Sequence, residues 1–310
     1  MSIYNLNIAI TVNKKDLWFC RICVASIRYY YPEIAIYLIK DELNGKFSTH
    51  EIEKYWKVKL INFKQRKFGW SGAKMHFYCD VRFKGQNWLV LDADIVMIGR
   101  ILDNDYVLNF ESDVIVSEEF HTAYESDWFT QTYFDYNKIK AEFPTYTYPG
   151  YTFNCGQLFC KGAFLSKEVL GPFFDFEKTP GWKMAHLLPL VDQSVFNLLF
   201  PQLSEKNKLK VGRAKYMIWG EDHSVLNEIP LSSITDGKTY PYLIHWAGCI
   251  RNPSLKQMNR SDILIFFEKY YYSIVALGTL KQTARTAVSS FWGFLRFIKR
   301  TVVDAKIKMR

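Results

Sequence analysis

The sequence predicts an α/β fold in which a mostly parallel, Rossmann-like central sheet is flanked by helices. Three observations support this prediction: a strand–helix–strand opening, an apolar strand that runs directly into two aspartates, and hydrophobic and aromatic contents of 49% and 17% that allow a large buried core. The 310 residues suit one large domain with an appendage. We assign residues 1–260 to this domain and residues 261–310 to a basic helical tail.

The opening of the chain alternates between strand and helix patterns. Leu6 to Val12 is an apolar run typical of a buried strand, and Ile34 to Ile39 is a second one. Between them, Leu17 to Tyr31 has helical apolar spacing and stops before Pro32. Since parallel strands need a crossover between them, and such crossovers are right-handed almost without exception, this order predicts a βαβ unit.

The next elements lead to a candidate site. Val58 to Phe63 is a further strand candidate, and Ala73 to Phe83 is a predicted helix. Asn87 to Leu91 is an apolar strand that ends abruptly in Asp92-Ala93-Asp94. In open α/β sheets ligands bind beyond the carboxyl ends of the strands, so the two acids stand where chemistry is expected. Glu125 to Tyr151 is aromatic and polar with poor periodicity, and we expect loops and a short helix there, beside the site.

Asp92 and Asp94 are candidate ligands of a divalent cation. In an extended segment residues i and i+2 project to the same side, so the two carboxylates can meet one ion with only the methyl group of Ala93 between them. Oxygen ligands select hard divalent ions, and such an ion would neutralise a diphosphate and stabilise it as a leaving group. The alternative is a strand-end pair of aspartates that only caps a loop.

The basic character of the chain is concentrated at its end. The segment from Lys281 to Arg310 carries eight Lys or Arg and one Asp, hence +7 of the formal net charge of +9. This distribution argues against a nucleic-acid-binding body. From Ser290 to Met309 apolar residues recur near helical spacing with basic residues on other faces, which predicts an amphipathic helix on an anionic membrane surface. The alternative is a helix packed on the domain or on a partner.

Compartment and cysteine chemistry follow from the same sequence. The first twenty residues contain no charged region followed by a long apolar run, so we expect no secretory signal and a cytoplasmic location, peripheral to the membrane. The most apolar candidate for a spanning helix, Ile263 to Gly278, is too short and contains Glu268 and Lys269. Free thiols are expected, and the Cys20-x-x-Cys23 pair lies in a helical pattern without zinc spacing. The other cysteines are Cys79, Cys155, Cys160 and Cys249.

Four segments together resemble one enzyme family. The stretch LVLDADIVMIG is similar to the D-x-D region of GT-A glycosyltransferases. Three later segments, in the same order and spacing, resemble glycosyltransferase family eight, which includes glycogenin and bacterial lipo-oligosaccharide galactosyltransferases. They are Phe153-Asn154-Cys155-Gly156-Gln157, Asp192-Gln193-Ser194-Val195-Phe196-Asn197 and His245-Trp246-Ala247-Gly248. With the opening strand and helix, the resemblance extends over residues 6–253 and implies a GT-A fold.

The resemblance implies a metal and diphosphate site. His245 would be the third protein ligand beside Asp92 and Asp94, and this mixed nitrogen and oxygen set favours Mn²⁺ over Mg²⁺. A lone His in an apolar strand such as YLIHWAG is more often a satisfied core residue, but Gly248 and Arg251 follow it as in the family. Arg251 stands where the family has Lys and would pair with the diphosphate. The pattern departs after it, because Asn252 precedes Pro253 and no Trp follows.

On the sugar side, the resemblance implies roles for Asp192 and Gln193. Asp192 would bind sugar hydroxyls, with a helix N-terminal cap as its alternative. Gln193 would lie on the sugar face opposite the leaving group. A covalent retaining mechanism needs a carboxylate nucleophile at that place, and Gln is a poor nucleophile. The resemblance therefore implies front-face attack with retention of configuration, Gln193 stabilising the oxocarbenium-like state.

The remaining donor contacts also come from the resemblance. Thr11, Val12 and Asn13 end the first strand where the family reads the nucleotide base, although Lys14 and Lys15 replace its usual acidic and polar residues. The other expected contacts are Asn154 with the donor sugar or its loop, and Ala93 and Gly248 with the donor. Lys74 is expected to reach a phosphate, and its alternative is a solvated helix residue. The remaining histidines match no ligand spacing and are given no role: His50, His76, His121, His186 and His223.

The predicted function is metal-dependent transfer of a hexose from a UDP-sugar, such as UDP-galactose or UDP-glucose, to a saccharide hydroxyl. A basic tail that binds membranes favours a lipid-linked acceptor, as in surface polysaccharide or lipopolysaccharide assembly. Two alternatives remain open. A sugar nucleotidyltransferase would share the layout but needs a Gly-rich loop after the first strand, where Thr11-Val12-Asn13-Lys14-Lys15 has no Gly. The other alternative is a noncatalytic glycosyltransferase-like module that binds saccharide or membrane.

Overall fold

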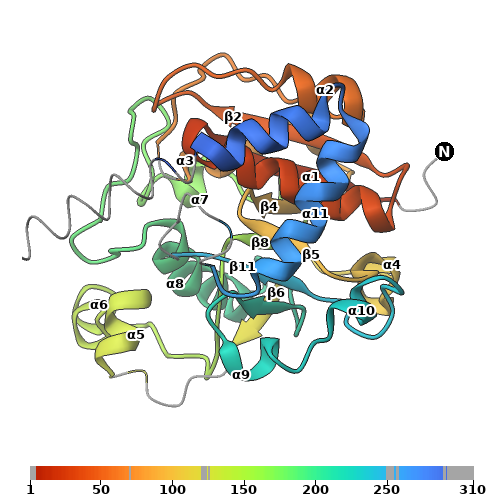
Figure 1. The fold of residues 1–310 in the computed structure, drawn as a ribbon. Helices are drawn as coiled ribbons and strands as arrows, with labels where there is room; N and C mark the ends of the chain where they lie inside the picture. Colours follow the sequence, from red (N-terminus) through yellow and green to blue (C-terminus); the bar gives the residue numbers. More distant parts are fainter. Residues whose placement is uncertain are drawn as a thin grey trace, which may run out of the picture.

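A central sheet with helices on both faces organises the molecule (Figure 1). The computed structural model describes residues 5–69, 71–119, 124, 126–248, 255, 258–288 and 291. The strands of the large sheet are β1 (Asn7–Asn13), β2 (Ala35–Asp41), β3 (Lys59–Leu60), β4 (Asn87–Asp92), β6 (Val114–Glu119), β7 (Thr152–Phe153), β8 (Gln157–Lys161) and β9 (Val211–Ala214). A smaller sheet contains β5 (Ile95–Met97), β10 (Met217–Trp219) and β11 (Leu243–His245).

The order of strands in the large sheet is β3-β2-β1-β4-β8-β6-β7, with β9 also paired to β6. The first four of these run parallel, and β9 is parallel to β6. Strands β8, β6 and β7 add antiparallel pairs. The predicted βαβ opening is confirmed, because β1 and β2 are parallel neighbours joined through a helix. Strand β3 is shorter than the predicted 58–63 segment.

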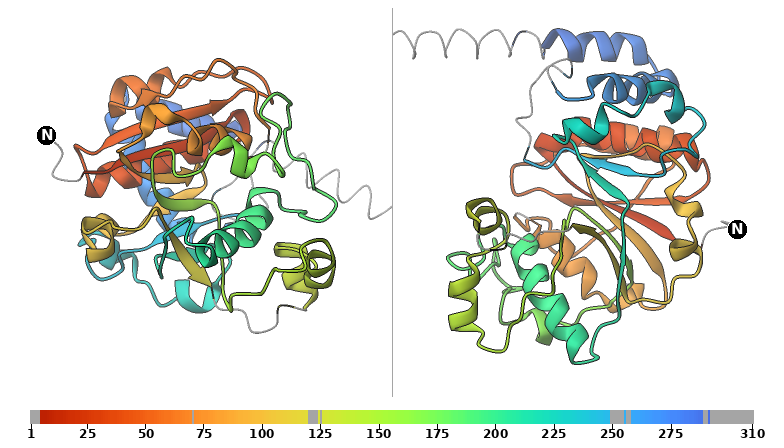
Figure 2. Two further views of the ribbon diagram at one scale, coloured as in Figure 1. Left: turned by 180° about the vertical axis from the view of Figure 1, so that it is seen from behind. Right: turned by 90° about the horizontal axis from the view of Figure 1, so that it is seen from below.

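Helices cover the two faces of the sheet unequally. The longest are α1 (Leu17–Tyr30), α8 (Asp192–Glu205) and α11 (Ser261–Ile274). In the right-hand view of Figure 2, α1 and α11 lie on one side of the sheet, and α3 and α8 lie on the other. The shorter helices are α2 (His50–Trp56), α3 (Gly72–Tyr78), α4 (Asp105–Leu108), α5 (Asp127–Thr132), α6 (Tyr136–Glu142), α7 (Lys167–Leu170), α9 (His223–Leu226) and α10 (Leu231–Ile234).

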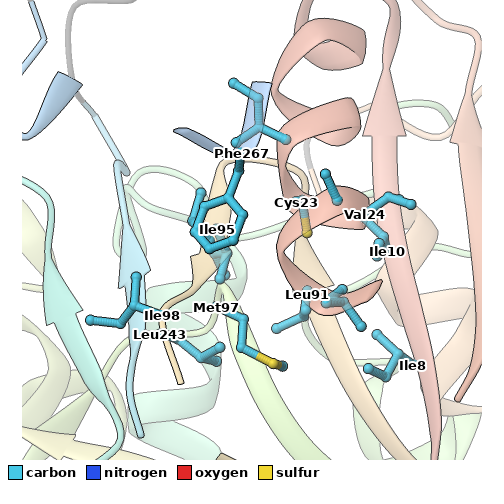
Figure 3. Close-up of a cluster of buried hydrophobic side chains, with 14 of the residues drawn as sticks. Ile8, Ile10, Cys23, Val24, Leu91, Ile95, Met97, Ile98, Leu243 and Phe267 are labelled. Carbon is cyan, nitrogen blue, oxygen red and sulfur yellow. The ribbon is translucent and has the colours of Figure 1, made fainter. Parts of the chain in front are cut away.

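The alternation of side chains along β1 and β4 divides the core into two clusters. Ile8 and Ile10 of β1 face α1, whereas Ala9 between them faces the α3 and α8 side. Strand β4 does the same, with Leu89 and Leu91 on the α1 side. Figure 3 shows part of this first cluster, in which Cys23 and Val24 of α1 lie beside the two strands. Both faces of the sheet are therefore buried, as a parallel α/β sheet requires.

Helix α11 contributes to the same first cluster. Its Ile263, Leu264, Phe267 and Tyr271 are buried there, and the Tyr271 ring stacks on Trp56 of α2. Residues 261–274, which the sequence assigns to the tail, thus pack on the α/β body. The domain boundary at residue 260 stays a prediction. The amphipathic helix expected at 290–309 lies outside the described residues, apart from Phe291.

The segment from residue 126 to 151 contains more helix than expected. It forms α5 and α6, where the sequence predicts loops and a single short helix. Both helices have side-chain N-caps: Ser126 accepts a hydrogen bond from the Phe129 amide, and Asp135 accepts bonds from the Asn137 and Lys138 amides. The caps make such short helices stable, and a search for apolar periodicity alone does not find them.

The thiols of Cys20 and Cys23 are buried in α1, and burial raises the pKa of Cys20 to about 12. Cys20, Cys23, Cys79, Cys155 and Cys160 are free thiols. Cys249 lies outside the described residues. Among the described helices, none combines the length and the apolar character that crossing a membrane requires.

Candidate active site

Asp92 is the last residue of β4 and is fixed by the neighbouring strand. Thr11 of β1 lies opposite Asp92 in the parallel register, and its hydroxyl donates a hydrogen bond of 2.9 Å to Oδ1 of Asp92. Removal of the Asp92 carboxyl from bulk water raises its pKa above the usual value; Lys74 opposes this shift and the neighbouring Asp94 adds to it. The sequence predicts Thr11 as a nucleotide contact, and in the structure its hydroxyl orients Asp92.

His245 comes from the other end of the chain and reaches Asp94 through strand pairing. Strand β5 begins directly after the D-x-D segment, and its Ile95 pairs with His245 at the end of β11 in antiparallel register. The Trp246 amide also donates to the carbonyl oxygen of Asp94 at 3.1 Å. As a result, Nε2 of His245 lies 3.2 Å from Oδ1 of Asp94. The small sheet therefore joins two segments that are about 150 residues apart.

Asp92, Asp94 and His245 form one cluster of potential ligands. Each offers one donor atom, and these three atoms lie within 4.8 Å of one another. Adjacent ligands of an octahedral ion with bonds of about 2.1 Å lie about 3 Å apart, so the cluster has dimensions that suit a small divalent cation. Burial pushes the pKa of Asp94 upward, but a proton carried by Nε2 of His245 outweighs it and holds that pKa below its usual value; a bound cation would take the place of this proton. Two carboxylates and an imidazole are donors that fit Mn²⁺ or Mg²⁺.

The His245 ring packs directly over the backbone of Gly156. A Cβ atom at residue 156 would lie 2.1 Å from Cε1 of His245, so only glycine leaves room for the ring. On the far side, the Trp219 ring stacks on His245 at 9° with centroids 6.0 Å apart. The Phe153-Asn154-Cys155-Gly156 segment therefore ends in glycine for a steric reason, because a side chain at residue 156 would displace the His245 ring.

Lys74 of α3 is a buried cation that holds two acidic groups. Its Nζ lies 2.8 Å from Oδ2 of Asp192 and 3.1 Å from Oδ1 of Asp92, and it donates a 3.0 Å hydrogen bond to the carbonyl oxygen of Cys155. Burial pushes the pKa of Lys74 downward, but the Asp192 and Asp92 carboxylates outweigh it and raise that pKa above its usual value. Lys74 therefore forms ion pairs with two carboxylates, and its contact with a phosphate stays a prediction.

Asp192 and Gln193 open helix α8 on the opposite wall. Asp192 is almost fully buried and pairs with Lys74, and Val191 before it has φ of +41°, a strained value for a β-branched residue. Oε1 of Gln193 accepts hydrogen bonds from the Cys155 amide at 2.8 Å and from Nδ2 of Asn154 at 3.4 Å. Nε2 of Gln193 is buried and has no hydrogen-bond partner among the described residues.

All of these groups line one cavity of about 920 Å³. It lies beyond the carboxyl ends of β1 and β4, where ligands of open α/β sheets bind. Val12, Asn13, Ala93, Asn154 and Gly248 also line it, and Gly248 has the positive φ of +69° that glycine tolerates. The side chain of Asn13 caps the short helix that follows β1. Arg251, the predicted partner of the diphosphate, lies outside the described residues.

The cavity also contains residues that the sequence analysis missed. Trp128 of α5 is 49% exposed at its wall, and Trp219 ends the short strand β10. Asp41 ends β2, and its carboxylate accepts backbone hydrogen bonds from Leu43, Phe68 and Gly69. Asp41 could have been identified from the sequence as a cavity residue, because it lies at the end of a strand. No local sequence pattern distinguishes Trp128 and Trp219 from the many other aromatic residues of this chain.

Comparison with known proteins defines the fold. The sequence matches no protein-family model and no curated protein. Among solved structures, the chain is similar to WbbM, a bifunctional glycosyltransferase, with a TM-score of 0.52 and 11% identity over 86% of this chain. The chain has the GT-A fold. It spans about half the length of WbbM (49%).

Two other solved glycosyltransferases are similar over 86% of the chain. They are GlyE of Streptococcus pneumoniae, with 16% identity, 59% of its length covered and a TM-score of 0.48, and the galactosyltransferase LgtC, with 12% identity, 96% of its length covered and a TM-score of 0.48. In the GT-A fold described above, the cluster of Asp92, Asp94 and His245 lies at the ligand-binding end of the sheet.

Proposed function

We propose that this protein is a metal-dependent glycosyltransferase that moves a hexose, galactose or glucose, from a UDP-sugar to a saccharide acceptor. The observation that carries the proposal is the Asp92, Asp94 and His245 cluster in the wall of a 920 Å³ cavity of a GT-A fold. A cavity of this size accommodates a nucleotide sugar. The carboxylates of the cavity repel a bare diphosphate, so a diphosphate can bind there only with a cation between it and the carboxylates.

The charges of the site support a divalent cation. Asp92, Asp94 and Asp192 supply three negative charges and Lys74 one positive charge, which leaves −2 on these four side chains. When bound by Asp92, Asp94 and His245, a cation such as Mn²⁺ would neutralise the diphosphate and stabilise it as a leaving group. Asp92 and Asp94 are held in place for this role by the Thr11 hydroxyl and by the pairing of β5 with β11.

On the sugar side, we propose that Asp192 and Gln193 contact the donor hexose. Lys74 fixes the Asp192 carboxylate, and the Cys155 amide fixes the carbonyl end of the Gln193 side chain. The buried Nε2 of Gln193 lacks a partner, and a hydroxyl or ring oxygen of the sugar is an acceptor that would satisfy it. Because Gln193 is not a carboxylate and cannot act as the nucleophile of a covalent mechanism, the proposal keeps front-face attack with retention of configuration.

The two alternatives predict different features. A sugar nucleotidyltransferase needs a Gly-rich phosphate loop after the first strand, but β1 is followed by a short helix at Lys14–Asp16 without glycine. A noncatalytic module has no need for the buried ion pair of Lys74 with Asp192, which is costly to desolvate. Both features favour the transferase.

A screen of nucleotide sugars tests the proposal. The full-length protein is incubated with UDP-, GDP-, ADP- and TDP-hexoses, with Mn²⁺ or with EDTA, and released nucleoside diphosphate is measured. We expect Mn²⁺-dependent release from a UDP-hexose. Release of pyrophosphate from a nucleoside triphosphate and a sugar 1-phosphate would identify a nucleotidyltransferase. Absence of turnover with all donors and saccharide acceptors would favour the noncatalytic module.

We further propose that the C-terminal region attaches the protein to an anionic membrane, where a lipid-linked acceptor of surface polysaccharide or lipopolysaccharide assembly would be found. Residues 278–288 are helical, and their polar side packs inward through Lys281 on Glu51 and Arg285 on Glu268. The apolar side chains point to solvent, and their helical spacing defines one stripe. This apolar stripe consists of Leu280 (66% exposed), Val288 (57%) and Phe291 (58%), continued by Leu277 (73%).

The charge of the following segment supports a lipid surface as the occupant of this stripe. Beyond residue 291 the sequence contains six Lys or Arg and one Asp. Each basic residue near an anionic leaflet contributes roughly 1 kcal/mol, and apolar insertion adds to it. Together they favour reversible, peripheral attachment on the cytoplasmic side of a membrane.

A further inference from the structure

We propose that Asn154 is a positioning residue, which keeps His245 in the tautomer and orientation that bind the cation. This inference rests on the proposed function, because it concerns the proposed metal site. It assigns Asn154 a different task from the donor-sugar contact that the sequence predicts. The inference depends on four hydrogen bonds around the Asn154 side chain and on the chemistry of a neutral imidazole.

The orientation of the Asn154 amide is fixed by backbone groups. Its Oδ1 accepts a 2.8 Å hydrogen bond from the Gly156 amide, and a backbone N–H can only donate. Its Nδ2 lies 3.4 Å from Oε1 of Gln193, and that oxygen accepts from the Cys155 amide, which again can only donate. Reversal of either side-chain amide would place two donors against each other. Oδ1 of Asn154 therefore faces His245.

This orientation determines where His245 carries its proton. Nδ1 of His245 lies 2.8 Å from Oδ1 of Asn154, which is an acceptor, so Nδ1 must donate. A neutral imidazole has one N–H, and Nε2 is then left with a free lone pair. Nε2 points to the Asp94 carboxylate at 3.2 Å. A lone pair and a carboxylate oxygen at this distance attract a shared cation, and metal-bound histidines are commonly oriented in this way through their second nitrogen.

Apart from the Asp94 carboxylate at Nε2, the other contacts of the ring fix its position and do not involve a ring nitrogen. Gly156 leaves room for the ring and Trp219 stacks on its face, but neither forms a hydrogen bond with a ring nitrogen. The ring is 3% exposed, so water does not easily replace Oδ1 of Asn154 as the acceptor if that side chain is removed. Among the described residues, Asn154 thus supplies the only hydrogen bond that selects the Nδ1–H tautomer.

The test compares Mn²⁺ binding by the full-length wild-type protein and two variants. Asn154→Ala removes the acceptor, and Asn154→Asp keeps one in the same place. Loss of such a partner typically weakens metal affinity 10–100-fold, so we expect this loss in Asn154→Ala and near-complete rescue in Asn154→Asp. Electron spin echo spectra of bound Mn²⁺ report the nitrogen ligand. The ¹⁴N modulation should persist in the wild type and in Asn154→Asp and decrease in Asn154→Ala.

Asn13→Ala is the matched control, because Asn13 lines the same cavity but its side chain bonds Asp16 and the Lys15 amide and contacts neither Asn154 nor His245. It should bind Mn²⁺ with wild-type affinity. Equal affinity and equal ¹⁴N modulation in Asn154→Ala and the wild type would overturn the inference and leave the metal site intact. Wild-type protein that binds Mn²⁺ no better than His245→Ala would overturn both the inference and the proposed metal site.

A second measurement needs no Asn154 variant and covers the case in which Asn154→Ala does not fold. Nitrogen NMR of ¹⁵N-histidine-labelled protein, saturated with Mg²⁺, reports the tautomer of each imidazole, and His245→Gln assigns the signal of residue 245. We expect a proton on Nδ1 of His245. A proton on Nε2 would contradict the inference directly.

Discussion

The Nζ atom of Lys74 lies 2.8 Å from Oδ2 of Asp192, inside the wall of the cavity. The side chains of both residues are less than a tenth exposed, and the same ammonium group also contacts Asp92 at 3.1 Å. One lysine of α3 therefore ties the proposed sugar-binding carboxylate to the proposed metal-binding carboxylate. The two halves of the proposed site are held at a fixed separation by a single buried charge.

We expect Lys74→Met to destabilise the protein strongly. The substitution leaves Asp92 and Asp192 without their shared counter-charge, and removal of one partner of a buried ion pair typically costs about 3–5 kcal/mol. Urea denaturation measures the loss. Lys210→Met is the control, because Lys210 pairs with Glu111 at 3.2 Å on the exposed surface, where a pair contributes about 0–1 kcal/mol. Equal effects of the two substitutions would refute the structural role of Lys74.

The example of Lys74 shows what the sequence can and cannot predict. The strand β4 and its terminal Asp92 and Asp94 are visible as an apolar run that stops at two acids. The ion pair of Lys74 with Asp192 is not visible, because 118 residues separate them and only the packing of α3 against α8 joins them. The same holds for Asn154, because its contact with His245 joins the turn between β7 and β8 to the end of β11.

Stability should fall more steeply with acidification in the wild type than in His76→Gln. His76 of α3 lies among the rings of Phe63, Phe68, Phe174 and Phe176. Burial in the first place, and the charge of Lys167, lower its pKa to about 4. An unfolded histidine has a pKa of about 6.5, so between these values the unfolded state binds more protons and stability is lost as the pH falls.

The measurement for His76 is the free energy of unfolding at pH 7 and at pH 5. Glutamine keeps an acceptor for Nε2 of Gln65, which lies 2.7 Å from the His76 ring nitrogen, but does not titrate. The wild type should lose more free energy of unfolding between the two pH values than the variant. An identical pH dependence of the two proteins would contradict the proposed neutral, half-buried state of His76.

The product should keep the anomeric configuration of the donor. This prediction follows from the proposed roles of Asp192 and Gln193, since Gln193 does not supply a carboxylate nucleophile. Gln193→Ala should lower kcat about 10–100-fold without abolishing turnover, because no covalent step is lost. Proton NMR of the initial product gives the configuration. An inverted product would exclude this mechanism while leaving the metal site unaffected.

Membrane attachment should depend on the apolar stripe of Leu277, Leu280, Val288 and Phe291. Leu280→Asp with Val288→Asp should abolish cosedimentation with anionic liposomes, because both side chains are exposed and no buried contact is lost. Thr283→Asp and Thr286→Asp place the same charges on other exposed positions and serve as the control. Binding of neutral and anionic liposomes to the same extent, or unchanged binding of the stripe variant, would argue for another role of this helix.

The most direct test of the central claim is the Mn²⁺ dependence of UDP release from a UDP-hexose by the wild type, Asp92→Asn and Asp94→Asn. The substitutions keep the shape of each side chain and remove its charge, and Lys74 keeps Asp192 as a partner in Asp92→Asn, so both variants should stay folded. We predict that EDTA, or either substitution, lowers the rate on the order of a hundredfold or more, as expected for lost Lewis-acid stabilisation of the leaving diphosphate. Near-normal, EDTA-insensitive release in either folded variant would show that Asp92 and Asp94 do not hold a catalytic cation.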